Sequence, residues 1–175
     1  MRKPAIRPRS TAGGRSVTVH VDGAARGNPG PAGVGIVISG GSSRKPSEMY
    51  AYLGEATNNV AETVALVLAL QEVLRRGEKQ VVVRTDSELL ANQVNGDYKV
   101  KDKQLIWFHV LIRHLVGCFD KFEIRHVPRE GNRHADKLAN RAVNEGLRKN
   151  PRPPAQPREE VQSPGSNQPT FWSES

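Results

Sequence analysis

The sequence predicts an α/β domain on a five-stranded mixed sheet, in which three strands form an antiparallel meander, two run parallel, and helices flank the sheet. Three observations predict this class. Strand-like segments come first as a group, strand and helix periods alternate after them, and 175 residues with 37% hydrophobic content suffice for one core rather than two.

The meander occupies the first third of the chain. Residues 17–21 alternate Val-Thr-Val-His-Val, which is typical of a strand with one buried face, and this strand ends at Asp22. Residues 34–38 and 49–53 predict two further strands, joined as a hairpin by turn residues that include Gly40, Gly41 and Pro46.

A helical period then begins. Apolar residues recur at helical spacing over 57–76, Asn58 or Asn59 can cap the start, and Gly77 ends the helix. The apolar run in 80–85 predicts a strand covered on both faces, and a short helix over 88–95 follows it.

The last elements complete the alternation. A helix begins at Asp102 and continues through Trp107, Leu111 and Leu115 to about residue 116. Residues 122–127 predict the fifth strand and residues 132–147 a final helix. The domain is therefore expected to cover residues 16–147.

Most of the net charge of +8 lies outside that domain. Residues 1–15 carry +5 and residues 148–175 carry +1, which leaves only +2 for the middle. Both ends have the composition of disordered tails, and a basic N-terminal tail would attract phosphate without sequence preference. An organellar transit peptide is a weaker interpretation of the N-terminal stretch, because it has almost no apolar face.

Composition also restricts the compartment. No apolar run is long enough to span a membrane, and the N-terminus lacks the apolar segment of a secretory signal. We therefore expect a cytoplasmic monomer that does not bind membranes. Cys118 is the only cysteine, which excludes an intramolecular disulfide, and we expect it to be a small buried hydrophobe.

Acidic residues in four contexts indicate a metal site. Asp22 and Asp86 follow hydrophobic strands, whereas Glu62 and Asp136 lie about one turn into two helices, where the helix dipole favours an anion. Carboxylates suit Mg²⁺ or Mn²⁺, and the absence of His or Cys from this set disfavours zinc. The set is large enough for two ions.

The motifs around these acids resemble those of type 1 ribonuclease H from about residue 17 to residue 147. They occur in the family's order: Asp22-Gly23 with Gly27-Asn28-Pro29-Gly30, Thr57-Asn58-Asn59 with Ala61-Glu62, Thr85-Asp86-Ser87, and Asn132 with Ala135-Asp136 and Leu138-Ala139. The resemblance implies a ribonuclease H-like fold and cleavage of the RNA strand of an RNA–DNA hybrid with two metal ions. It implies that Asp22 bridges both ions, that Glu62 and Asp86 complete one site, and that Asp136 holds the ion that activates water.

The resemblance also implies substrate contacts. Asn28, Asn58 and Asn59 match positions that contact the minor groove and the DNA strand, and Thr57 matches a residue that binds a DNA phosphate. Each has a simpler structural role as well, because Asn28 before proline forms turns and Thr57 or Asn58 caps helices.

The chain departs from the best-known members in three places. Glu88 replaces a glutamine that contacts the groove, and a short loop with Lys99 and Lys101 replaces a long basic protrusion, so the chain resembles the compact branch of the family. The family's loop histidine has no clear counterpart. Arg129, as a cation near the scissile phosphate, is slightly preferred to His126, which ends a predicted strand.

Other functions remain open at this point. A module of the same fold could bind hybrid or double-stranded RNA without cutting it, although the complete acid set favours an enzyme. A transposase, integrase or junction resolvase shares the fold, but its acids usually have other contexts. Double-stranded RNA also remains a secondary substrate class.

Overall fold

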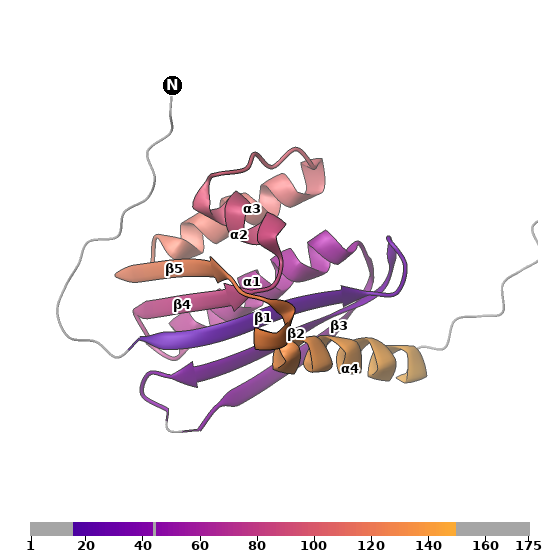
Figure 1. Cartoon of the computed structure of the whole chain (residues 1–175), viewed down its shortest axis with the longest axis horizontal. Coiled ribbons are helices and arrows are strands. Elements are labelled where there is room, and N and C mark those ends of the chain that lie inside the picture. The colour runs from indigo at the N-terminus through magenta and orange to yellow at the C-terminus, as the bar shows by residue number, and fades with distance from the viewer. Residues whose placement is uncertain (1–15, 44, 150–175) are drawn as a thin grey trace, which may run out of the picture.

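The computed structural model of the chain describes residues 16–43 and 45–149 (Figure 1). The predicted tails therefore lie almost entirely outside the described residues. The elements are β1 (Val17–Ala25), β2 (Gly30–Gly40), β3 (Ser47–Ala56), α1 (Asn58–Arg75), β4 (Gln80–Thr85), α2 (Glu88–Asn95), α3 (Lys103–Val116), β5 (Lys121–His126), the 3-10 turn η1 (Arg129–Gly131) and α4 (Arg133–Lys149).

The sheet confirms the predicted class. Its strand order is β3-β2-β1-β4-β5, with β1, β2 and β3 antiparallel and with β1, β4 and β5 parallel. The meander strands are longer than predicted, because β2 and β3 extend beyond residues 34–38 and 49–53 and Asp22 does not end its strand. The antiparallel ladder with β2 continues from Asp22 to Ala25, whereas the parallel ladder with β4 stops at His20.

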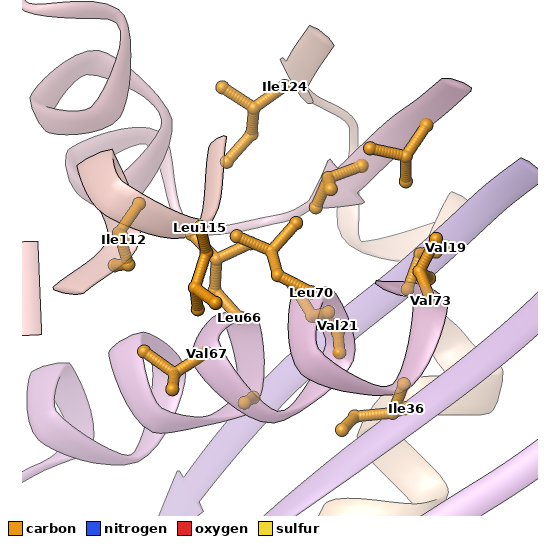
Figure 2. Close-up of a cluster of buried hydrophobic side chains, with 14 of the residues drawn as sticks. Val19, Val21, Ile36, Leu66, Val67, Leu70, Val73, Ile112, Leu115 and Ile124 are labelled. Atoms are coloured by element: carbon orange, nitrogen blue, oxygen red, sulfur yellow. The ribbon is translucent and has the colours of Figure 1, made fainter. Parts of the chain in front are cut away.

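The two faces of the sheet are covered by different helices. In Figure 2, Leu66 and Leu70 of α1 pack between Val21 of β1 and Leu115 of α3, which makes the main core. Figure 1 shows α4 on the opposite side of the sheet from α1, in front of β2 and β3. No helix among the described residues is long and apolar enough to cross a bilayer.

Helix ends follow local chemistry. The hydroxyl of Thr57 accepts a hydrogen bond from the Val60 amide at 3.3 Å, so Thr57 rather than either following asparagine caps α1. Gly96 ends α2 in the left-handed region at φ 88°, and the Asp102 carboxylate accepts bonds from the Gln104 and Leu105 amides to begin α3.

The predicted helix is confirmed as α3, but the expectation that Cys118 is buried was wrong. The buried stripe of this helix runs through Leu105, His109 and Ile112 to Leu115, whereas Trp107 is 76% exposed. Cys118 is exposed as well, because it lies in the turn after α3, where its thiol donates weakly to the His114 carbonyl at 3.5 Å. An apolar or small residue type alone does not indicate which side of a helix faces the core.

Candidate active site

Strand register brings Asp22 and Asp86 to the same level of the sheet. His20 is the register partner of Arg84, and each acid lies two residues further along its strand direction. Since side chains two residues apart point to the same face, both acids emerge just beyond the end of the parallel ladder. Asp86 directly follows β4, as predicted, whereas Asp22 lies within β1 and not at its end.

A glycine brings Glu62 to the same place. A Cβ atom added at Gly23 would lie 2.1 Å from the Glu62 amide nitrogen and 2.3 Å from the Ala61 carbonyl carbon. Only glycine therefore allows the first turns of α1 to cross β1 this closely. The contact places Glu62 beside the residue that follows Asp22.

A second glycine has the same role on the other face. A Cβ atom at Gly35 would lie 2.1 Å from the Ala135 carbonyl oxygen and 2.5 Å from the Ala139 amide nitrogen of α4. Gly35 is the register partner of Asp22, so this close crossing brings the first turn of α4, which contains Asp136, to Asp22. The structure thus brings the four predicted carboxylates to one place.

The pKa of Asp22 reflects the proximity of the other three acids. The pKa of Asp22 is raised from 3.8 to about 7, first by burial and then by the charges of Asp86, Asp136 and Glu62, against the opposing bond from the Gly23 amide. The carboxyl is 7% exposed and accepts that bond at 2.9 Å. Its charged form is therefore disfavoured where no cation is bound.

Glu62 is held by two side chains. Ser87 donates to one carboxylate oxygen at 2.5 Å and Asn58 donates to the other at 2.8 Å. Burial is the main cause that raises the pKa of Glu62, the charge of Asp86 adds to it, and the two donors lower it. Sequence reasoning missed the role of Ser87, whose hydroxyl also accepts from the Leu90 amide as the cap of α2.

Asn132 connects three elements behind the acids. Its side-chain amide donates to the Asp86 carboxylate at 2.7 Å and to the Val21 carbonyl at 3.0 Å, while its backbone carbonyl accepts from the Asp136 amide. The residue is 1% exposed, and its side-chain oxygen has no hydrogen-bond partner among the described residues. The motif contained Asn132, but nothing in the sequence assigned it this contact.

Arg129 and His126 occupy different positions. The Arg129 guanidinium in η1 donates to the Asp136 carboxylate at 3.1 Å, and this bond raises the pKa of Arg129, with smaller contributions from the charges of Asp136, Asp86 and Asp22. His126 is the last residue of β5 and is exposed. The arginine is therefore the one in contact with an acid of the site.

Four of the residues predicted to contact substrate, namely Asn28, Thr57, Asn58 and Asn59, form a rim at the start of α1. The Asn28 side chain accepts a bond from the Asn58 amide at 3.2 Å, which ties the loop between β1 and β2 to the helix. Asn59 is exposed on the first turn of α1, and Glu88 is exposed on the first turn of α2. Lys99 and Lys101 are exposed in the loop before α3.

The donor chemistry of the site fits hard divalent ions, because every candidate ligand is a carboxylate and Asp22 is coupled to the other three. As the side chains stand, however, no three His, Cys, Asp or Glu residues within 16–43 and 45–149 are grouped to hold an ion. The carboxylates of Glu62, Asp86 and Asp136 instead accept hydrogen bonds from side chains of the protein. The Arg129–Asp136 pair is exposed enough to open at small cost.

Comparisons with known proteins agree with this geometry. A family model described as reverse transcriptase-like matches residues 20–142. Ribonuclease HI of Halobacterium salinarum is 42% identical over 76% of this chain and 66% of its own length, and a bifunctional protein of Mycobacterium tuberculosis is 38% identical over 73% and 35%. The chain thus spans two thirds or less of these relatives, but it covers 93% of the ribonuclease H of Alcanivorax borkumensis, at 32% identity.

Solved structures give the same answer. The crystal structure of ribonuclease H1 from Halobacterium salinarum has a TM-score of 0.71 at 41% identity, over 74% of this chain and 98% of that one. LC11-RNase H1 in complex with an RNA/DNA hybrid has a TM-score of 0.69 at 42% identity, over 75% and 99%. In sequence, strand order and fold, this chain belongs to the type 1 ribonuclease H family.

Proposed function

We propose that the chain is an endoribonuclease that hydrolyses the RNA strand of RNA–DNA hybrids with the help of two divalent metal ions. The observation that carries the proposal is the buried Asp22 carboxyl, whose pKa is raised by burial and by three neighbouring acids. Such a cluster is unfavourable unless cations neutralise it. The hybrid bound to the related LC11 enzyme supports the substrate class.

Asp22, Glu62, Asp86 and Asp136 would hold the ions. The proposed assignment gives Asp22 to both ions, Glu62 and Asp86 to one, and Asp136 to the other. Two Mg²⁺ ions, or Mn²⁺ in their place, would supply a nucleophilic hydroxide from water and stabilise the leaving oxygen. The roles described next are those of the protein's own side chains.

Three neutral side chains preorganise the acids. Ser87 and Asn58 fix both oxygens of Glu62, and Asn132 fixes one oxygen of Asp86. Ligands whose free rotation is already restricted lose less entropy when they bind an ion, so these donors raise affinity and precision together.

Arg129 is proposed as the cation that exchanges partners. It pairs with Asp136 in the described structure, and it would turn to the scissile phosphate when that carboxylate binds an ion. His126 is the alternative for proton transfer or product release.

The rim at the start of α1 and three residues outside it would select the hybrid. Asn28, Asn58 and Asn59 would contact the minor groove and Thr57 a DNA phosphate, while Lys99 and Lys101 would add a small phosphate contact. Glu88 could accept a bond from a 2′-hydroxyl group. We propose that the protein acts as a cytoplasmic monomer, with double-stranded RNA as a secondary substrate.

A cleavage assay with labelled hybrid, double-stranded RNA, single-stranded RNA and DNA duplex tests this function. Asp86→Asn should lower hybrid cleavage in Mg²⁺ by about a thousandfold or more while hybrid binding persists. Asp97→Asn, the same change on an exposed loop, is the matched control and should leave cleavage unchanged. Metal-dependent cleavage that survives Asp86→Asn contradicts the proposal, and wild-type protein that binds hybrid without cutting it would indicate a binding module.

A further inference from the structure

An apolar face on α3 is the largest feature that the proposed function does not use. Four apolar residues on two successive turns of this helix are exposed. Ile106 is 40% exposed, Trp107 76%, Val110 46% and Leu111 37%. We call these four residues the α3 apolar face. Exposed apolar patches of this kind usually mark an interaction site.

Two further exposed apolar or aromatic residues lie on the segments before α3. Leu89 of α2 is 38% exposed and Tyr98 of the following loop is 50% exposed. Figure 1 shows α2 and α3 side by side at the edge of the molecule away from α4.

The charge of α3 narrows the choice of partner. The helix contains Lys103 and Arg113 but no Asp or Glu. Two copies of the chain joined through this helix would bring bases together and no acids, which is unfavourable. The expected occupant therefore combines apolar or aromatic side chains with negative charge.

A segment of the same chain has that composition. Residues 159–175, here called the acidic tail segment, contain Glu159, Glu160 and Glu174, no Lys or Arg, and the aromatic pair Phe171-Trp172. This segment lies outside the described residues. We propose that the acidic tail segment binds the α3 apolar face within the same molecule, with Phe171 and Trp172 packing around Trp107.

The connecting length permits this contact. Phe171 is 22 residues beyond Lys149, where α4 ends. A coil of that length spans about 26 Å on average and about 70 Å when extended, whereas a domain of this size has a radius of gyration of about 14 Å. Tethering also gives an effective concentration of about 1 mM, at which a weak contact is populated.

Trp107 and Trp172 are the only tryptophans, so each can be observed alone. The matched full-length variants are Trp172→Phe, which keeps two aromatic residues in the tail, and the double variant Phe171→Ser with Trp172→Ser, which removes both. Trp107 is the sole emitter in each. Acrylamide quenching of Trp107 should be about twofold weaker in the first variant, because a packed ring loses roughly half of its exposed area.

Equal quenching in the two variants overturns the proposal. A difference that disappears on dilution also overturns it, because contact within one molecule does not depend on concentration. The exposed thiol of Cys118 offers a second readout, since it lies about 12 Å along the helix direction from Val110. A nitroxide at Cys118 in the wild-type chain should broaden the Trp172 indole NMR signal, and an unbroadened signal would exclude docking.

Discussion

Asp22→Asn should stabilise the metal-free protein at alkaline pH while it abolishes cleavage. In the folded chain the pKa of Asp22 is raised from 3.8 to about 7, mainly by burial and then by the charges of Asp86 and Asp136. Asparagine keeps an oxygen that can accept the bond from the Gly23 amide, but it carries no charge. The substitution therefore removes repulsion without removing the local hydrogen bond.

The magnitude follows from proton linkage. Because the folded pKa lies above the unfolded one, the folded state binds the proton more tightly, and the stability from this group is fully present below about pH 3.8. It is lost as the pH rises toward and through about 7. A difference of roughly three pKa units corresponds to about 4 kcal/mol, which is the upper limit for the change in unfolding free energy across this window.

Urea denaturation with chelator at intervals from pH 4 to pH 9 measures this effect. The quantity to compare is the unfolding free energy of Asp22→Asn minus that of wild type, because groups far from Asp22 titrate equally in both proteins. Glu72, whose pKa is lowered to about 2 mainly by its bond from Arg75, is one such group, and its contribution is lost in a lower window, as the pH falls below 4.5.

The difference should grow by about 2 to 4 kcal/mol between pH 4 and pH 8. The exposed Asp97→Asn change should alter stability by no more than about 0.5 kcal/mol at any pH. Mg²⁺ at about a hundred times its dissociation constant should restore about 2.7 kcal/mol to wild type and much less to Asp22→Asn. A difference that stays constant from pH 4 to pH 8 would refute the assignment of Asp22 as a buried carboxyl strained by its neighbours.

Three further predictions, with four substitutions, test the rest of the site. Gly23→Ala should displace the start of α1, since the new Cβ would lie 2.1 Å from the Glu62 amide, and we expect cleavage to fall at least about a hundredfold with a loss of about 1 to 3 kcal/mol in urea denaturation. Asn132→Ala should release the Asp86 carboxylate and raise the Mg²⁺ concentration needed for half-maximal cleavage by about 10-fold to 100-fold, and an unchanged metal requirement would contradict that role. Arg129→Ala should lower the turnover number about tenfold or more while His126→Ala has little effect, and the opposite ranking in single-turnover kinetics would favour the histidine.

The sequence was sufficient for the fold class because its periods were clear. The group of strands before the first helix and the alternation afterwards correspond to the observed strand order. The uninterrupted Val81, Val82 and Val83 predicted a strand covered on both faces, and in β4 Val81 and Val83 are fully buried while Val82, on the other face, is half-buried. Hydrophobic periodicity reflects which face of a helix or strand is buried, and every residue of the element contributes to that pattern.

The sequence was insufficient where one contact decides the outcome. The alternating pattern of β1 was expected to stop at Asp22, but pairing with β2 continues past this polar residue because the ladder bonds involve the backbone. The polar contacts made by Ser87 and Asn132 join residues that are 25 and 46 positions apart. Contacts between residues so far apart in the sequence leave no periodic pattern by which they could be predicted.

The positions of the acids depend as much on glycine as on the carboxylates themselves. Gly23 and Gly35 lie on adjacent strands and face opposite sides of the sheet, so α1 and α4 approach Asp22 from opposite faces. Any side chain at either position would push one helix away from the sheet and with it Glu62 or Asp136. Two acids on strands could have been aligned by register alone, but the acids on helices reach the same place only because the sheet has no side chain where each helix crosses it.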